Sequence, residues 1–192
     1  MIAGGVDLIQ LRGKNRSIDE LTELASELHK ITLAASVPLI VNDHAEVARR
    51  VSIEAVHVGQ DDESIASVRR AVGRAVWIGK STHSVDQAVA AQGEGADYIG
   101  FGPIYATPTK PDYPPIGLND IRAVYEQAAL PIFCIGGIKL HNLPDVIAAG
   151  AKRVVIVSGL LQAKNVADYA RECKQLLAAP QQKLKPLKLL QG

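Results

Sequence analysis

Short apolar runs recur along the chain, and nearly all are followed by polar residues. Seven runs have the length of strands: Val6 to Leu11, Pro38 to Val41, Ala55 to Val58, Val76 to Gly79, Tyr98 to Phe101, Ile132 to Ile135 and Val154 to Val157. Their apolar residues are nearly continuous and seldom alternate with polar ones. This pattern is typical of strands covered on both faces, as in a parallel sheet.

The segments between these runs have helical patterns. Ser17 and Glu20 have the spacing of a capping box, and Ser84 and Gln87 repeat it. One apolar stripe follows Ser17 and comprises Ile18, Leu21, Leu24, Leu28 and Ile31. Strands that alternate with helices in this way predict βα repeats joined by right-handed crossovers.

The polar residues after the runs favour one of two architectures. They are Gln10 to Lys14, Asn42-Asp43, Gln60 to Asp62, Ser81 to His83, Thr107 to Lys110, Gly136-Gly137 and Ser158. In a (β/α)₈ barrel these strand ends meet on one face, where barrel enzymes carry their active sites. A doubly wound sheet is the alternative, but no GxGxxG motif follows the first run. The sequence therefore predicts an α/β protein with a TIM (β/α)₈-type barrel.

One barrel domain is expected over residues 1–178, and the C-terminal extension 179–192 is expected to be loosely ordered because two prolines interrupt it. Only seven strands are readable, and a closed barrel needs an eighth between Val154 to Val157 and Val6 to Leu11. We therefore expect a barrel with a gap at that seam, apparently lacking the first β-strand and helix, or a chain whose natural start lies upstream.

Composition narrows the functional class. The net charge of +1 and the 4% of aromatic residues argue against a nucleic-acid partner. No apolar run approaches the ~18 residues of a membrane span, and no signal peptide is visible, so a cytoplasmic protein is expected. Cys134 lies inside an apolar run, which predicts a buried, reduced thiol.

Two clusters of polar residues suit an anionic ligand and a metal. Gln10, Arg12 and Lys14 occupy alternate positions, so an extended segment would point all three side chains into one site. Asn42-Asp43 and Asp61-Asp62 follow successive strands, and two carboxylates there could share Mg²⁺ beside a diphosphate. The alternative for the second pair is an acidic helix start, where carboxylates favour the dipole.

Three later loops suit phosphate groups. The stretch Gly102 to Lys110 contains two prolines, which stiffen it, and its Thr107, Thr109 and Lys110 offer two hydroxyls and an ammonium. Gly136-Gly137 and Val157-Ser158 end the last two strands, where backbone N–H groups can bind phosphate. For the glycines the alternative is tight turning alone.

Taken in order, these segments resemble the thiamine phosphate synthase family over roughly residues 3–178. The segments that carry the resemblance are QLRGK, VNDH, HVGQDD, GKSTH, GPIYATPTK, IGGI and the Val157-Ser158 segment. Each is weak alone, but all stand in the family's order and each follows a predicted strand.

The resemblance implies a TIM barrel that joins a hydroxymethylpyrimidine diphosphate to a thiazole phosphate, giving thiamine phosphate and diphosphate. It implies small-molecule partners and Mg²⁺ held by Asp43 and Asp62. The residues implied to bind the pyrimidine diphosphate are Gln10, Arg12, Lys14, Asn42 and Lys110, with Ser81 beside the reacting centre. Ser81, Lys110 and Arg12 form the implied catalytic set. The residues implied to hold the thiazole phosphate are Thr107, Thr109, Gly137, Val157 and Ser158.

The sequence departs from the family at Gly13, where an acidic residue is usual, and at His44, where arginine is common. Two other functions stay open: a thiazole tautomerase-like isomerase and a non-catalytic protein that binds thiamine precursors. Pro103 stands where the tautomerases carry a histidine and cannot transfer a proton, which favours the synthase. His57 is interpreted as a strand residue and His83 as a helix cap. A homo-oligomer is also left open.

Overall fold

The computed structural model describes residues 1–107 and 113–179. Seven strands form one sheet in the order β1-β2-β3-β4-β5-β6-β7, and every neighbouring pair is parallel. Their bounds are Ile9–Leu11 (β1), Leu39–Asn42 (β2), Ala55–Val58 (β3), Trp77–Thr82 (β4), Tyr98–Phe101 (β5), Ile132–Ile135 (β6) and Val154–Val155 (β7). The consecutive order is that of a barrel and differs from a doubly wound sheet, whose strand order reverses at a switch point.

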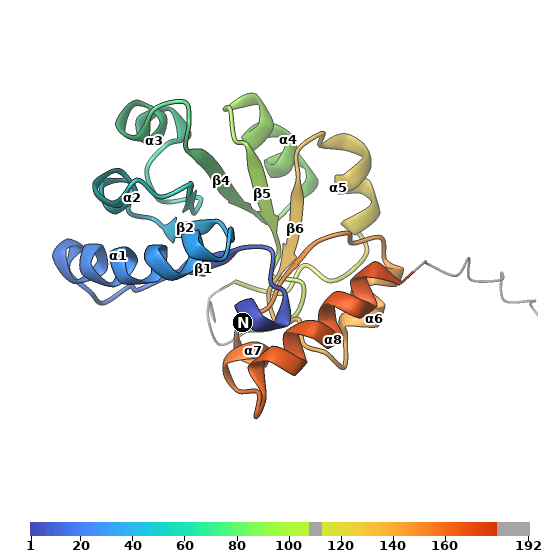
Figure 1. Cartoon of the computed structure of the whole chain (residues 1–192). Helices are drawn as coiled ribbons and strands as arrows, with labels where there is room; N and C mark the ends of the chain where they lie inside the picture. The colour runs from blue at the N-terminus through green and yellow to red at the C-terminus, as the bar shows by residue number, and fades with distance from the viewer. Residues whose placement is uncertain (108–112, 180–192) are drawn as a thin grey trace, which may run out of the picture.

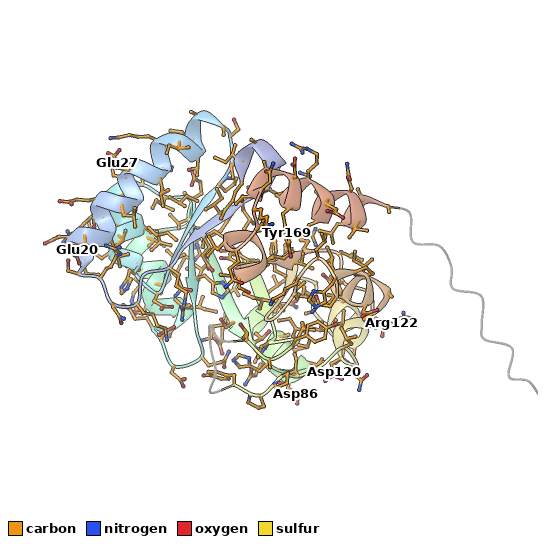
Figure 2. All side chains as sticks on the ribbon, turned by 90° about the horizontal axis from the view of Figure 1, so that it is seen from below. Glu20, Glu27, Asp86, Asp120, Arg122 and Tyr169 are labelled. Atoms are coloured by element: carbon orange, nitrogen blue, oxygen red, sulfur yellow. The ribbon has the colours of Figure 1, made fainter. Side chains whose placement is uncertain are left out.

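Helices follow the strands and lie on their outer side (Figure 1). The α-helices are Ile18–Ala34 (α1), Ala45–Val51 (α2), Ile65–Val72 (α3), Val85–Gly93 (α4), Ile121–Gln127 (α5), Leu143–Ala148 (α6), Ser158–Leu161 (α7) and Val166–Ala178 (α8). A short 3₁₀-helix, Ile2–Gly4 (η1), precedes the first strand. In the view from below, the helices again surround the strands (Figure 2).

The core lies between the sheet and these helices. Along β3 and β5, alternate residues Val56, Val58, Ile99 and Phe101 are completely buried. Cys134 of β6 is also buried, and it is a free cysteine, as predicted. Its burial raises the pKa of the thiol to about 12, so it stays protonated at neutral pH. The outward positions of the strands are thus filled by apolar packing, which leaves the inward positions for the site.

The sheet has two free edges. Among residues 1–107 and 113–179, no strand pairs with the outer edge of β1 or of β7. The η1 segment packs against α8 close to this seam: a Cβ added to Gly4 would lie 2.4 Å from the Ala167 carbonyl oxygen. Lys174 of α8 donates hydrogen bonds to the Gly5 carbonyl and to Asp7, each at 2.7 Å. The predicted gap in the barrel is therefore present between β7 and β1.

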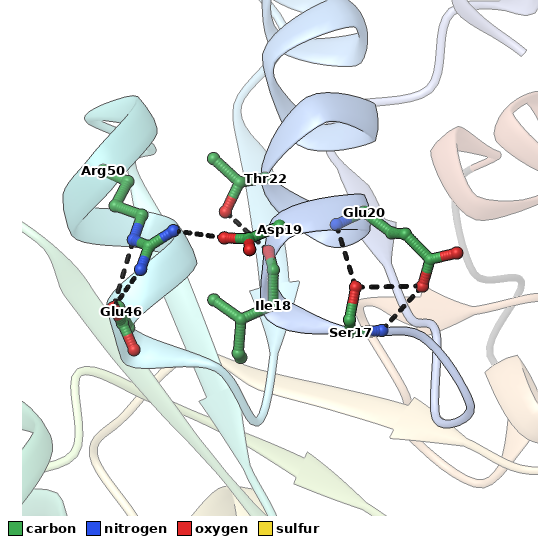
Figure 3. Close-up of polar contacts among 7 residues, drawn as sticks. All are labelled: Ser17, Ile18, Asp19, Glu20, Thr22, Glu46 and Arg50. Atoms are coloured by element: carbon green, nitrogen blue, oxygen red, sulfur yellow. Dashed lines mark hydrogen bonds and ion pairs between the residues drawn. The ribbon is translucent and has the colours of Figure 1, made fainter.

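The local signals for α1 are confirmed. The Ser17 hydroxyl accepts a hydrogen bond from the Glu20 N–H, and the Glu20 carboxylate accepts one from the Ser17 N–H (Figure 3). Arg50 of α2 donates to Asp19 of α1 and to Glu46, which ties the two helices together (Figure 3).

Several predicted bounds were wrong. The first strand begins at Ile9 and not at Val6, β4 extends to Thr82, and β7 ends at Val155. Ile31 was expected in the buried stripe of α1, but its side chain is 59% exposed. The helix packs mainly against β2 and α2, so only part of the stripe reaches the core. Of the predicted extension 179–192, all but Ala179 lies outside the described residues.

Candidate active site

A cavity lies at the carboxyl ends of the strands, where the sequence predicts a site. Eight of the predicted ligand-binding residues line it: Gln10, Arg12, Asn42, Ser81, Thr107, Gly137, Val157 and Ser158. They come from the ends of β1, β2, β4, β5, β6 and β7 or from the loops that follow them. The parallel sheet thus brings together residues that are up to 148 positions apart, from Gln10 to Ser158.

Arg12 supplies a buried cationic donor to this cavity. Its Nη2 atom is shielded from solvent and has no hydrogen-bond partner within the described part of the chain. A buried guanidinium N–H without an acceptor is costly, because it has given up its water. An anion in the cavity would supply the missing acceptor, and a phosphate oxygen suits a guanidinium well.

Asp43 and Asp62 form a carboxyl pair beside Arg12. Burial raises the pKa of Asp43, and the hydrogen bond and the negative charge of Asp62 raise it further, whereas His44 and Arg12 act in the opposite direction. Asp62 also accepts a hydrogen bond from the Gly59 N–H at 2.6 Å. Two carboxyl groups this close repel each other when both are ionised, and a divalent cation relieves that repulsion. The pair therefore fits the hard oxygen ligands of Mg²⁺.

No group of three or more His, Cys, Asp and Glu residues suited to a metal ion is present among residues 1–107 and 113–179. A cation at Asp43 and Asp62 would therefore complete its coordination with other oxygens. Waters and the oxygens of a bound diphosphate are the natural source, since Mg²⁺ usually keeps waters and binds substrate phosphates.

Ser81 lies in the cavity wall next to a residue that sequence reasoning placed only in a strand. The Nε2 atom of His57 is 3.0 Å from the Ser81 Oγ, and its Nδ1 is 3.3 Å from the Tyr98 hydroxyl. Burial raises the pKa of Tyr98, so its hydroxyl remains protonated and can donate. His57 is thus a cavity residue, and a polar residue at the middle of an apolar strand was the signal for it.

The sequence analysis expected His83 to cap the helix that follows it, but this prediction was wrong. Ser84 is the N-cap of α4, and its hydroxyl accepts from the Gln87 N–H. The His83 ring instead contacts the Gly102 carbonyl through Nδ1 and stacks on Tyr113, with ring centroids 4.6 Å apart. His83 therefore lines the cavity and joins the end of β4 to the loop after β5.

The loops after β5 and β6 are bound to each other through their backbones. The Ile104 N–H donates to the Ile135 carbonyl at 2.8 Å, and the Tyr105 N–H donates to the Gly136 carbonyl at 3.0 Å. Pro103 lies in the cavity wall between them. These bonds fix the two glycines of the IGGI segment against the loop that carries Thr107.

The remaining predicted residues are placed differently. Lys14 is exposed and is not among the residues that line the cavity. The extended strand β1 ends at Leu11, so the alternation that was expected to align Lys14 with Gln10 does not continue that far. Thr109 and Lys110 lie outside the described residues.

Comparison with known proteins identifies the family. The family described as thiamine monophosphate synthase matches residues 1–160. The chain belongs to this family. It is 44% identical over 183 residues to a thiamine-phosphate synthase from Chloroflexus aurantiacus, covering 95% of this chain and 84% of that protein. A second thiamine-phosphate synthase, from Shouchella clausii, is 44% identical over 166 residues, covering 86% of this chain and 79% of its own.

The structure agrees with this family. It matches the solved thiamine phosphate pyrophosphorylase from Pyrococcus furiosus with a TM-score of 0.85 and 29% identity, covering 92% of this chain and 85% of that chain. The predicted family, its transferase class and the TIM-type barrel that lacks part of its first unit are thereby confirmed. Of the functions weighed, the relatives favour the synthase over the tautomerase. No helix in the described ranges is long and apolar enough to cross a membrane.

Proposed function

We propose that the cavity joins a pyrimidine carrying a diphosphooxymethyl group to a thiazole phosphate, forming thiamine phosphate and diphosphate. The observation that carries this proposal is the buried Arg12 Nη2, which has no partner among the described residues and lies beside the Asp43–Asp62 pair. A site with one guanidinium donor that lacks an acceptor among the described residues, a carboxyl pair and three loops suited to phosphate fits a reaction in which a diphosphate departs.

The cavity divides into two parts. Gln10, Arg12 and Asn42, from the first two strands, would hold the pyrimidine diphosphate, and Ser81 would lie beside the reacting carbon. The loops after β5, β6 and β7 would hold the thiazole phosphate. The residues assigned to that second part are Thr107, Gly137, Val157 and Ser158. Lys14, Thr109 and Lys110 remain predicted ligands from the sequence alone.

Asp43 and Asp62 would hold Mg²⁺, which when bound neutralises part of the charge of a diphosphate. The fit rests on the carboxyl pair itself, because the partial burial of Asp43 and the negative charge of Asp62 beside it favour binding of a cation. Arg12 would act independently of the metal, because its guanidinium can donate hydrogen bonds to the anionic oxygens of the diphosphate whether or not Mg²⁺ is present.

The proposed reaction requires no proton transfer by the residues of the site. The bond from the methylene carbon to the diphosphate oxygen breaks, and its electron pair leaves with the diphosphate. The electron-rich aminopyrimidine stabilises the resulting cation. The thiazole nitrogen donates its lone pair to that carbon and forms the new C–N bond. Because this nitrogen carries no proton, the site needs no strong general base, and the His57–Ser81 contact serves to orient groups.

The test is to incubate the purified protein with both substrates and Mg²⁺ and to measure thiamine phosphate by mass spectrometry. Arg12→Ala should lower kcat/KM by about 10²–10³-fold, as expected when a donor to developing negative charge is removed. Arg16→Ala is the matched control, because Arg16 lies in the same loop and is exposed. Absence of product from the wild-type protein, or equal activity of Arg12→Ala and the control, would refute the proposal.

A cytoplasmic location is part of this proposal, and the oligomeric state is open to measurement. Size-exclusion chromatography with light scattering would establish the second of these.

A further inference from the structure

The IGGI loop has an unusual backbone. Gly136 and Gly137 both have positive φ values, of 100° and 63°. Glycine adopts positive φ values readily, but it also adopts many other backbone conformations. Two consecutive glycines therefore leave the peptide groups beside them free to rotate unless other contacts hold them. The Gly137 and Ile138 N–H groups have no acceptor among the described residues, and both residues line the cavity. The Tyr105 N–H holds the Gly136 carbonyl, so the Gly137–Ile138 peptide needs a further contact to keep its direction.

Asn142 holds one side of the loop. Its Nδ2 donates to the Gly137 carbonyl at 3.1 Å, and its Oδ1 accepts from the Lys139 N–H at 2.7 Å. Because the Gly137 carbonyl is bound to Asn142, the Gly137–Ile138 peptide cannot rotate freely. The Ile138 N–H therefore keeps one direction. Asn142 itself does not line the cavity, so it contacts the loop and not the ligand space.

Tyr169 joins this loop to the next one. Its hydroxyl accepts a hydrogen bond from the Leu140 N–H at 2.7 Å. The same hydroxyl lies against the backbone of Gly159, where a Cβ would come within 2.4 Å of it. Tyr169 belongs to α8 (Figure 2), and it is not among the residues that line the cavity. One side chain thus touches both the loop after β6 and Gly159, which follows Ser158 at the start of α7.

We infer that Tyr169 and Asn142 are positioning residues for the thiazole phosphate, acting through the loops after β6 and β7. The inference rests on the proposed function for the identity of the ligand. Asn142 fixes the direction of the Gly137–Ile138 peptide, and Tyr169 sets the spacing between that peptide and Ser158. A phosphate bound by both segments needs the N–H donors of the peptide to point at it and needs the right spacing between that peptide and Ser158. Affinity is highest when these donors are aligned before the ligand binds.

The chain offers a matched control in Tyr125. Its hydroxyl likewise bonds to backbone groups, donating to the Ile132 carbonyl at 2.9 Å and accepting from the Lys152 N–H at 3.0 Å, whereas that of Tyr169 accepts one such bond. These groups lie at the start of β6 and before β7, at the opposite ends of the same two strands. A Tyr125→Phe variant therefore loses comparable hydrogen bonds without touching either loop.

The experiment measures the Kd of thiazole phosphate and of inorganic phosphate by calorimetry, and the KM of both substrates. Tyr169→Phe should raise the Kd and KM of thiazole phosphate about three- to tenfold, while the KM of the pyrimidine diphosphate changes by less than about twofold. Asn142→Ala should do the same. Tyr125→Phe should lower the melting temperature and leave every Kd unchanged.

Thiazole phosphate binding by Tyr169→Phe and Asn142→Ala at the wild-type Kd would overturn the inference. An equal loss of thiazole phosphate affinity in Tyr125→Phe would also overturn it. So would an equal rise in the KM of both substrates in Tyr169→Phe, because the effect would then be a general loosening of the barrel. A wild-type protein that binds thiazole phosphate but forms no product would refute the proposed reaction, and the Kd values would still decide the role of Tyr169. A wild-type protein that binds neither probe would overturn the inference.

Discussion

At the scale of single residues, the carboxyl pair offers a sharp test. Asp62→Asn should lower the apparent affinity for Mg²⁺ at least several-fold, because an amide oxygen carries no net charge to attract the cation. The fold should be retained, since the amide oxygen can still accept the hydrogen bond from Gly59. The measurement is the rate of thiamine phosphate formation as a function of Mg²⁺ concentration.

Asp61→Asn is the control for that test. Asp61 is adjacent in sequence and is exposed like Asp62, but it accepts a hydrogen bond from the Tyr113 hydroxyl instead of joining the pair. Its Mg²⁺ dependence should match the wild type. A full-rate Asp62→Asn variant with an unaltered Mg²⁺ curve would show that Asp62 serves only its backbone hydrogen bond.

The residues that sequence reasoning placed correctly are those at the ends of strands. Ser81, Asn42 and Ser158 follow directly from the rule that parallel strands end on one face. His57 was interpreted only as a strand residue, although it is the one polar residue of β3 and therefore marks the face of that strand that lines the cavity. Lys14 does not line the cavity with Gln10 and Arg12, because the alternation of side chains holds only while the backbone is extended, and β1 ends three residues earlier.

At the scale of elements, the capping box of α1 should be measurable. Ser17→Ala removes the acceptor of the Glu20 N–H, and loss of such a cap costs about 1 kcal/mol, or about 2–4 °C in melting temperature. Ser26→Ala, in the middle of the same helix, is the control, because Ser26 makes no side-chain hydrogen bond in the described structure. Equal melting temperatures for Ser17→Ala and the wild type would mean that α1 is held by packing alone.

Glu54 joins several elements at the opposite end of the strands. Its Oε1 is 3.0 Å from His29 Nε2 of α1, and its Oε2 accepts from the Leu39 N–H of β2 at 3.0 Å. Burial by itself would raise the pKa of Glu54, but these hydrogen bonds outweigh it, and the pKa lies below its ordinary value. The ionised carboxylate is thus favoured by folding. Its contribution is present above about pH 4.5 and is lost as the pH falls through the lowered pKa.

We therefore expect Glu54→Gln to lower the melting temperature at pH 7 by about 1–3 °C, a small effect because the side chain is partly exposed and screened. The difference from the wild type should shrink below about pH 4.5. Thermal unfolding across this pH range is the measurement. Glu27→Gln is the control, since Glu27 forms only an exposed ion pair with Lys30 and should change the melting temperature little at any pH.

At the scale of the whole molecule, the open seam should appear in hydrogen exchange. Among the described residues, the amides of β1 and β7 have a strand neighbour on one side only, whereas β3, β4 and β5 are paired on both sides. Exchange should therefore be fastest in the two edge strands, because their hydrogen bonds open locally without unfolding the sheet. Mass spectrometry of peptides covering each strand would measure this.

Edge strands that exchange as slowly as β4 would contradict the expectation and would indicate that another segment or another chain pairs with them. The sequence could predict this gap because it follows from counting strands. It could not predict the packing of η1 on α8, which depends on a close approach of Gly4 to Ala167 that no sequence pattern announces.

The backbone bonds between the loops after β5 and β6 also bear on how this site can be altered by engineering. Ile104 and Tyr105 donate to carbonyls of the β6 loop, and Tyr169 continues the connection to the β7 loop. A graft of one loop from another barrel enzyme would break hydrogen bonds belonging to its neighbours. The three loops are therefore best exchanged together with Tyr169, as a single unit. The carboxylate-bearing loops after β2 and β3 form a second unit, because Asp43 and Asp62 are hydrogen-bonded to each other.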